Sequence, residues 1–503
     1  MHYYSNLLSA FQLVTAPTNL VYCFVGVFMG TLIGVLPGIG PVGAMAILLP
    51  VTFGISPVTA VIMLAGIYYG AQYGGSTTSI LVNIPGEAST VVTCLDGYQM
   101  ARKGRAGPAL GIAALGSFIG GTFSLIGLMF LAVPLSEVAL KFGPPEYFAL
   151  MCLGMTLVIY LAKGSLIKAA VMMVFGLILG TVGTDNISGK LRFDFGIEEL
   201  LEGIHLVPLV MGLFGVSEVL VNIEKALGSR TVLKTKLRNL FPNVEDWKKS
   251  TGPIIRGSLL GFFLGILPGG GAILSSFVSY TTEKRISKHP EEFGYGAIEG
   301  VAGPETANNA ATGGAFIPLM ALGIPPNAVM ALLFGALLIH GIAPGPLFIP
   351  THPDIFYGTI ASMYIGNMML LILNLPLIGL WVKLLRVPGQ ILFPLILLFC
   401  LIGAYSVNNS LFDVMVMVVF GTVGYVLRKY EYEEAPLVLA FILGPMLETA
   451  FRQSLIISDG QLSVFFTRPI SCGALVISVA LFLLSGVGFF RRVRAKVTQI
   501  GEE

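Results

Sequence analysis

The chain has 503 residues, of which 55% are hydrophobic and 11% are charged, and its net charge is +2. Soluble globular proteins carry about 25% charged residues, so this composition excludes a cytosolic enzyme, a nucleic-acid-binding protein and a disordered chain. The mean hydropathy of +0.85 indicates an integral membrane protein. The length allows roughly ten to thirteen membrane segments of about 20 residues each, so the predicted fold class is an all-α polytopic membrane protein.

The N-terminus and the cysteines carry no sign of processing or cross-linking. Residues 1–14 contain no Lys or Arg. They therefore lack the basic region of a cleaved signal peptide, and we expect them to be retained. The cysteines form no CxxC pair and lie mostly in apolar runs, so we interpret them as small buried hydrophobic residues. They are Cys23, Cys94, Cys152, Cys400 and Cys472.

Lys and Arg cluster in particular connections between the apolar segments. By the positive-inside rule these connections are cytoplasmic; they lie at 102–105, 163–168, 222–256, 284–288, 383–386, 428–429 and 491–496. Connections poor in Lys and Arg are predicted outside, at 1–18, 54–57, 341–353 and 404–410, together with the mixed stretch 185–203. The N-terminus is therefore predicted outside and the C-terminus inside.

The apolar segments alternate between these connections. In chain order, spans are predicted at 108–134, 146–162, 165–183 and 204–222, and then at 355–382, 389–404, 411–427, 436–450 and 470–490.

Two halves of the chain resemble each other. Residues 26–40 read GVFMGTLIGVLPGIG and residues 257–271 read GSLLGFFLGILPGGG. Residues 73–86 resemble 312–326 with one residue inserted, and 208–218 resemble 436–448. We predict a first membrane repeat at 1–222, a basic cytoplasmic linker at 223–256, a second repeat at 257–452, and a final transmembrane helix with a basic tail at 453–503.

Equivalent loops of the two halves carry opposite charge. The loop 102–105 is basic, whereas its counterpart 341–353 has no Lys or Arg. The loop 54–57 is uncharged, whereas its counterpart 283–292 is basic. One repeat is therefore predicted to be inverted, a recurrent construction of secondary transporters with the site near the midplane between the halves. Chance similarity between glycine-rich apolar segments is the alternative.

The motifs LPGIG at 36–40 and LPGGG at 267–271 interrupt apolar runs. The arms around them, about 22–35, 41–53, 255–266 and 272–282, are too short for a bilayer of about 30 Å, so each unit is predicted to be a re-entrant helical hairpin. Backbone N–H groups and helix N-termini at such a tip can bind an anion. The candidates are Gly38, Gly40, Gly269, Gly270 and Gly271. Alternatively, these glycines only allow close helix packing.

Two polar islands lie in otherwise apolar regions, where such side chains must face a site or one another. The candidates of the first island are Gly74, Gly75, Ser76, Thr77, Thr78, Ser79 and Asn83. Those of the second are Thr306, Asn308, Asn309, Thr312, Gly313 and Gly314. Their hydroxyls and amides can bind carboxylates or coordinate Na⁺. The alternative is a satisfied hydrogen-bond network between helices.

Residues 1–101 and 289–382 contain no Lys or Arg. An anion bound there would depend on helix dipoles, backbone N–H groups, hydroxyls and a co-bound cation, which favours sodium coupling over an arginine clamp. The acids near the islands can carry a proton or ligate Na⁺; they are Glu87, Asp96, Glu299 and Glu305. The first two could equally lie in the polar loop before Arg102. Glu305 is preferred, with Asn308 and Asn309 as further Na⁺ ligands.

Enzyme signatures are absent from the sequence. It has no HExxH, GxSxG or GxxxxGK[ST] motif, and its histidines show no ligand spacing. No catalytic residue, no cofactor beyond a coupling Na⁺ or H⁺, and no nucleic-acid partner is predicted.

Five long motifs carry a resemblance to a known family. They are GVLPGIGPVGAMAILLP (34–50), YYGAQYGGSTTSILVNIPGE (68–87), DGYQMARKGRAGPALGIAALGSFIGG (96–121), GILPGGGA (265–272) and GPETANNAATGGAFIPLMALGIPP (303–326). With them the chain resembles, over nearly its whole length, the large permease subunit of the bacterial tripartite tricarboxylate transporters. The resemblance implies a permease of the inner membrane that works with a small four-helix membrane subunit and a periplasmic binding protein.

The resemblance also implies uptake of citrate-like or other organic carboxylates driven by an ion gradient, without identifying the carboxylate. The N-terminus would then be periplasmic and the C-terminus cytoplasmic. We expect secondary active transport coupled to Na⁺ or H⁺, in which one bundle moves against a scaffold in an elevator-like manner. The alternatives are a carboxylate channel and a non-transporting scaffold subunit.

Overall fold

The computed structural model describes residues 2–36, 39–162, 165–185, 187–225, 240–384 and 389–485. It confirms an all-α, multi-pass membrane protein, because seven helices within the described residues are long and apolar enough to cross a membrane. A short antiparallel hairpin is formed by strands β1 (Gly183–Thr184) and β2 (Leu191–Arg192).

The first half contains ten of the helices that the structure describes. They are α1 (His2–Thr15), α2 (Pro17–Val35), α3 (Gly40–Leu48), α4 (Pro57–Val82), α5 (Val91–Arg102), α6 (Ala106–Ala139), α7 (Pro144–Leu161), α8 (Leu166–Gly180), α9 (Leu206–Val210) and α10 (Ser217–Lys225). A π-helical turn, Met211–Val216, joins α9 to α10.

The second half begins after the linker. Its helices are α11 (Val244–Ile266), α12 (Gly271–Ile286), α13 (Glu299–Gly314), α14 (Ala328–Ile339), α15 (Phe348–Thr351), α16 (Pro353–Asn374), α17 (Ile378–Leu384), α18 (Gly389–Asn408), α19 (Leu411–Lys429), α20 (Ala435–Ile457), α21 (Val464–Thr467) and α22 (Pro469–Ser485). A π-helical turn, Pro318–Leu322, follows α13.

Most of the predicted spans coincide with these helices, but the single span predicted at 355–382 is wrong. Helix α16 ends at Asn374, and α17 begins only at Ile378. The cause is Pro376, which lacks a backbone N–H and disfavours the helical conformation at Leu375. The orientation of the spans in the membrane stays a prediction.

Three of the four arms of the tips, α2, α11 and α12, are longer than predicted. Helix α11 has 23 residues and begins at Val244 because the Asn243 side chain caps it, accepting a hydrogen bond from the Asp246 N–H. Helix α2 has 19 residues, about 28 Å at 1.5 Å per residue. Helix α3, with nine residues, is therefore too short to cross a bilayer, as predicted, whereas the short arm predicted for α2 is wrong. Lys163, Arg386, linker residues 226–239 and the tail 486–503 lie outside the described residues.

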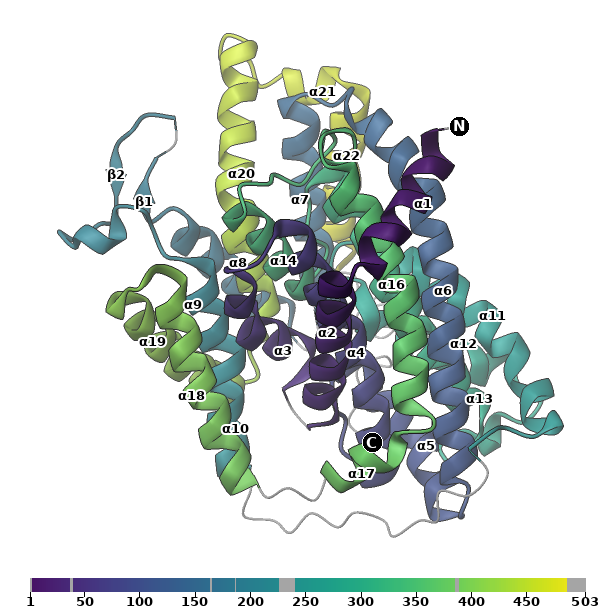
Figure 1. Cartoon of the computed structure of the whole chain (residues 1–503). Coiled ribbons are helices and arrows are strands. Elements are labelled where there is room, and N and C mark those ends of the chain that lie inside the picture. The colour runs from purple at the N-terminus through teal and green to yellow at the C-terminus, as the bar shows by residue number, and fades with distance from the viewer. Residues whose placement is uncertain are drawn as a thin grey trace.

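Helices α2 and α4 pack closely through glycines, and Figure 1 shows them side by side near the centre of the molecule. At every fourth position of α2 a glycine lies against a backbone carbonyl of α4, where a Cβ would overlap the oxygen. The pairs are Gly26 with Met63, Gly30 with Ile67, and Gly34 with Ala71.

The second half repeats this arrangement between α11 and α13, which lie beside α6 (Figure 1). The pairs are Gly257 with Gly303, Gly261 with Ala307, and Gly265 with Ala311. The glycines recur 231 positions later and the carbonyls 240 positions later. Equivalent residues of α4 and α13 are therefore 240 positions apart, and the loop before α13 holds the additional residues.

This contact pattern corrects the alignment of the polar islands. Gly74 lies against the Thr31 carbonyl of α2, and Gly314 lies against the Phe262 carbonyl of α11. Gly74 is thus the counterpart of Gly314. The sequence alignment that begins at residues 73 and 312 instead pairs Gly74 with Gly313. It is wrong by one residue, because the additional residues of the second half lie in the loop before α13.

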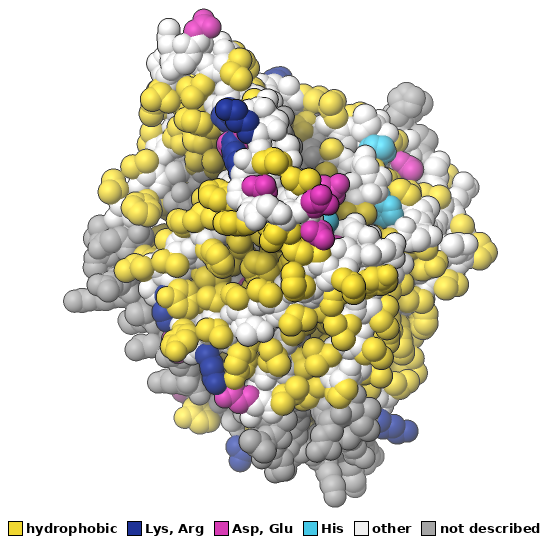
Figure 2. All heavy atoms as spheres, turned by 90° about the vertical axis from the view of Figure 1, so that its left-hand side faces the viewer, with side chains coloured by type: hydrophobic (Ala, Val, Ile, Leu, Met, Phe, Trp, Pro, Cys, Tyr) yellow, Lys and Arg dark blue, Asp and Glu magenta, His cyan; other side chains and the backbone are white. Residues whose placement is uncertain are grey.

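Large hydrophobic side chains also cover much of the outer surface. Figure 2 shows them across the middle of one face, with most of the charged side chains above and below. Ile167 and Phe130, for example, are 76% and 67% exposed. Such a surface suits a lipid environment. Of the cysteines, Cys23 and Cys400 are buried as predicted, whereas Cys94, Cys152 and Cys472 are partly exposed.

Candidate functional site

Two short segments turn the chain at equivalent places in the two halves. Asn83, at the end of α4, and Gly323, after the π-turn of the second half, both have left-handed backbone, with φ of 59° and 71°. Four residues later, Glu87 and Asn327 share an extended conformation, with φ and ψ of −146° and 170° in one and −152° and 171° in the other. Each caps the next helical turn. Glu87 and Asn327 are therefore structural equivalents.

The first tip lies against Glu87. A Cβ on Gly40 would be 3.7 Å from the Glu87 Cβ, and one on Gly75 would be 3.0 Å from the Glu87 Cγ. From the other half of the chain, the Asn308 amide of α13 donates a hydrogen bond of 3.3 Å to Glu87 Oε1. Ser89 also donates to this carboxylate. The first tip and both predicted islands thus meet at one buried acid.

The second tip lies against Asn327 in the same way. A Cβ on Gly271 would be 4.0 Å from the Asn327 Cβ, and the Gly269 N–H donates to the Pro326 carbonyl at 2.9 Å. The Asn327 amide donates to the Tyr68 hydroxyl of α4 at 3.4 Å. Both Gly40 and Gly271 have positive φ, 62° and 52°, which explains why glycine occupies these two tip positions.

The same contact occurs twice, once with each half of the chain supplying the helix and the other half supplying the residue beside the tip. Tyr68 and Asn308 are equivalent positions, so the pair Asn308–Glu87 corresponds to the pair Tyr68–Asn327. A second exchanged pair lies beside them. The Tyr68 hydroxyl is hydrogen-bonded to Thr312, and Gln72, with its amide nitrogen turned towards the acceptors, donates to Asn308 Oδ1 at 2.7 Å. We call these residues, with Glu87 and Asn327, the crossed cluster.

Glu305 forms a second polar centre between α13, α4 and α5. Its side chain is 1% exposed. Ser76 donates a hydrogen bond of 2.5 Å to Oε2, and Thr93 donates to Oε1. The Glu305 backbone carbonyl accepts from Ser117 of α6 at 3.4 Å and from Asn309 at 3.2 Å. Of the predicted residues, Ser76 therefore contacts the buried Glu305 carboxylate, whereas Asn309 contacts the Glu305 backbone.

Other predicted site residues serve helix packing in this structure. The Thr78 hydroxyl donates to the Val35 carbonyl at the end of α2, at 2.6 Å. Ser79 donates to the Gly75 carbonyl and to Thr90. The remaining packing residues are Gly74, Gly270, Thr306, Gly313 and Gly314, which lie against neighbouring backbone or side chains. These contacts are those of helix packing, and a role for these residues in a binding site stays a prediction. Thr77 lines a small cavity discussed below, and Gly38 lies outside the described residues.

Asp96 has a structural role away from the tips. It is fully buried, and its Oδ1 accepts hydrogen bonds from the backbone N–H groups of Gly294, Gly296 and Ala297 at 2.7–2.9 Å. Tyr280 donates to Oδ2 at 2.9 Å. This carboxylate therefore holds the loop between α12 and α13. Glu299 lies in the first turn of α13.

Sequence reasoning did not single out several members of these centres. They are Tyr68, Gln72, Thr93, Ser117 and Asn327. One signal was present for Asn327, because IPGEA at 84–88 and IPPNA at 324–328 continue the repeat and pair this residue with Glu87. Tyr68 and Ser117 carried no such signal, since their partners lie on other helices.

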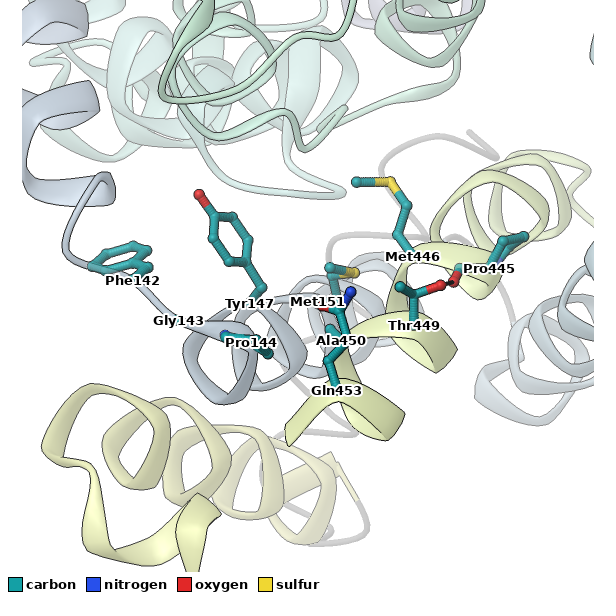
Figure 3. Close-up of a pocket in the computed structure, with 10 residues that line it drawn as sticks. All are labelled: Phe142, Gly143, Pro144, Tyr147, Met151, Pro445, Met446, Thr449, Ala450 and Gln453. Carbon is teal, nitrogen blue, oxygen red and sulfur yellow. Dashed lines mark hydrogen bonds between the residues drawn. The ribbon is translucent and has the colours of Figure 1, made fainter. Parts of the chain in front are cut away.

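A larger cavity of about 500 Å³ opens between α7 and α20 (Figure 3). Its lining is mainly apolar and includes Tyr147, Met151 and Met446, and Figure 3 shows Tyr147 and Met446 pointing to the same side of the two helices. None of the predicted site residues lines it. The crossed cluster is instead enclosed, with Asn308 and Thr312 fully buried.

Comparisons with known proteins agree with this architecture. Residues 20–439 match the model of the tripartite tricarboxylate transporter TctA family. An uncharacterised 52.8 kDa protein from the TAR-I ttuC′ 3′ region of Agrobacterium vitis is 55% identical over 493 residues, 98% of each chain. An uncharacterised protein from the TAR-II ttuC′ 3′ region of the same organism is 54% identical over 237 residues, 47% of this chain and 98% of that protein. No solved structure matches.

Proposed function

Because the chain belongs to the tripartite tricarboxylate transporter TctA family, we propose that it imports tricarboxylates or related organic carboxylates across the bacterial inner membrane. It would be the permease of a system with a small four-helix membrane subunit and a periplasmic binding protein that delivers the substrate. A Na⁺ or H⁺ gradient would drive accumulation. The N-terminus would lie in the periplasm and the C-terminus in the cytoplasm.

The observation that carries the proposal is the crossed cluster. Contacts that recur with the two halves exchanged are those expected at an interface with two-fold symmetry. Together with the opposite loop charges, they support two inverted repeats related by an approximate two-fold axis. In transporters built this way, substrate and ion sites lie between the repeats at broken helices.

The chemistry of the cluster suits an organic anion. Asn308 and Asn327 supply amide groups and Tyr68 supplies a hydroxyl. Gly40 and Gly271 place the first turns of α3 and α12 beside Glu87 and Asn327, and a helix N-terminus favours an anion. Since residues 1–101 and 289–382 contain no Lys or Arg, a co-bound cation would offset the negative charge of a carboxylate there. The proposed cation ligands of the sequence analysis are Glu305, Asn308 and Asn309.

Burial of the cluster implies a conformational cycle. A substrate would reach Asn308 or Thr312 only after the tips separate from α4 and α13, so we propose alternating access with an elevator-like displacement of the tip bundle. The second tip already packs against α7, where a Cβ on Gly154 would be 3.6 Å from the Pro268 Cβ. This contact is a candidate boundary between moving and fixed parts.

Uptake into proteoliposomes tests the proposal. The permease is reconstituted with its small subunit, loaded binding protein is supplied outside, and labelled di-, tri- and aromatic carboxylates are compared with and without an inward Na⁺ or H⁺ gradient. Accumulation above the equilibrium level under one of the gradients is expected. If no accumulation occurs under either gradient with loaded binding protein present, active transport is ruled out.

A further inference from the structure

A cavity of about 10 Å³ lies between α4, α6 and α16, and two of its lining residues, Ser76 and Ser117, are hydrogen-bonded to Glu305. This volume is close to the space of a single water molecule. Its polar lining comes from Tyr73, Ser76, Thr77, Ser117 and Asn374. The cavity is separate from the crossed cluster, and Asn374 was not among the residues predicted from the sequence.

Three of the four lining hydroxyls, those of Ser76, Tyr73 and Ser117, donate their protons to partners elsewhere. Ser76 donates to Glu305 Oε2 at 2.5 Å, and Tyr73 donates to Asn367 Oδ1 at 2.6 Å. Ser117 accepts a hydrogen bond from Asn309 at 2.7 Å and donates to the Glu305 carbonyl at 3.4 Å. These three residues therefore have only oxygen lone pairs left for a guest in the cavity.

Asn374 adds an acceptor that has no partner. Its amide nitrogen donates to the Leu370 carbonyl at 2.9 Å, which leaves its oxygen for the interior. Asn374 is 3% exposed, and its Oδ1 is without a hydrogen bond among the residues that the structure describes. A buried, unsatisfied amide oxygen is costly, so its position in the lining points to an occupant.

From this geometry we propose that the cavity is a Na⁺ site, with oxygen ligands from Ser76, Tyr73, Ser117 and Asn374 and with the Glu305 carboxylate as the compensating charge. A water molecule can donate only two protons and would leave some of these lone pairs unsatisfied. A small hard cation can use all of them. A buried carboxylate held by two hydroxyls also gains from a nearby positive charge.

This site deepens the proposed function, on which it rests, by naming where the coupling ion binds. It moves the cation from the Asn308 and Asn309 amides, predicted from the sequence, to Ser76 and Asn374, and keeps Glu305. Because Ser76 bridges the cavity and Glu305, and α4 also carries Tyr68 of the crossed cluster, Na⁺ in the cavity would fix the helix that holds part of the substrate site.

The test is Na⁺-dependent thermal stability of the purified full chain in nanodiscs, with choline chloride keeping the ionic strength constant. The wild-type melting temperature is expected to rise saturably with Na⁺ and not with K⁺. In Asn374→Ala the Na⁺ concentration for half the effect should rise at least about tenfold, as expected when a metal site loses a supporting group. Asn222→Ala on α10 is the matched control and should behave as wild type.

A wild-type chain without a Na⁺-specific rise, or an Asn374→Ala chain with the wild-type Na⁺ dependence, would overturn the proposal. If Asn374→Ala does not yield a folded chain, Glu305→Gln replaces it, since this change keeps the shape and removes the charge, and it should abolish the Na⁺ effect. Counterflow exchange of a carboxylate separates this proposal from the function. If the chain exchanges the carboxylate but shows no Na⁺ effect on its melting temperature, only the proposed Na⁺ site is ruled out. If it shows the Na⁺ effect but no exchange, only the proposed transport function is ruled out.

Discussion

The amide of Asn308 donates a hydrogen bond of 3.3 Å to the carboxylate of Glu87, joining α13 of the second half to the segment that covers the first tip. In the equivalent pair, the Asn327 amide donates a hydrogen bond of 3.4 Å to the Tyr68 hydroxyl, which joins the segment at the second tip to α4 of the first half. Each half therefore completes the polar surroundings of the other half's tip. A site built in this way depends on both halves at once.

The crossed pairs predict matched losses on mutation. Asn308→Ala and Asn327→Ala should each weaken substrate binding by about 1–2 kcal/mol, the usual cost of a lost buried hydrogen bond. That corresponds to a roughly 5–30-fold rise in the dissociation constant. Titration of the purified variants with labelled carboxylate measures the effect, with Asn222→Ala as the control. Wild-type affinity in both site variants would show that the crossed cluster is not the substrate site.

The glycine contacts predict equal damage at equivalent positions. Gly30→Val and Gly261→Val each place side-chain atoms on a carbonyl of the facing helix, Ile67 in one half and Ala307 in the other. Overpacking of this kind costs about 1–3 kcal/mol or more, so both variants should melt at lower temperature. Gly473→Val is the control because a Cβ there meets nothing within 4 Å. Wild-type melting of Gly30→Val and Gly261→Val would contradict the packing described.

A disulfide can test whether the second tip moves against α7. A Cβ at position 154 would be 3.6 Å from the Cβ of residue 268, within the range for a disulfide, about 3.5–4.5 Å. In a chain without its native cysteines, Gly154→Cys with Pro268→Cys should cross-link readily. Cross-linking should stop uptake, and reduction should restore it. Each single variant is a control for the substitution itself, and undiminished uptake by the cross-linked chain would exclude this moving boundary.

The hairpin after α8 predicts an acid dependence. Arg452, followed by the backbone N–H groups of Ile187 and Ser188, holds the pKa of Asp185 well below its ordinary value of 3.8. This contribution to stability is fully present above pH 3.8 and is lost as the pH falls through the lowered pKa. Arg452→Gln should therefore expose residues 183–203 to proteolysis at pH 7. In wild type the same exposure should require strong acid, and equal cleavage of both chains at pH 7 would refute this anchoring.

Much of the fold could be predicted because its determinants are local. Apolar runs and Lys/Arg clusters located most helices, and the LPG motifs located both tips. The break at Pro376 and the early start of α11 at Asn243 also have local causes, but the apolar pattern outweighed them. The family assignment followed from the length of the motifs.

The candidate site could be predicted only in part because its contacts span the two halves. Thr78, Ser79 and Gly74 have the composition of a polar island and yet serve packing, which depends on the helix face they occupy. Asn374 and Ser117 look unremarkable in sequence, and only the packing of α16 and α6 against α4 brings them to the cavity that Ser76 lines. Residue type thus indicated polar centres, while helix packing decided which atoms meet.

Counterflow exchange can show whether the crossed cluster is the substrate site of a transporter. Proteoliposomes loaded with an unlabelled tricarboxylate are diluted into labelled substrate at the same Na⁺ concentration on both sides, with wild type, Asn308→Ala and Asn327→Ala compared. We expect transient, saturable accumulation of label by wild type and a large reduction in both variants. Downhill flux without accumulation would identify a channel, and wild-type exchange by both variants would contradict a substrate site at the crossed cluster.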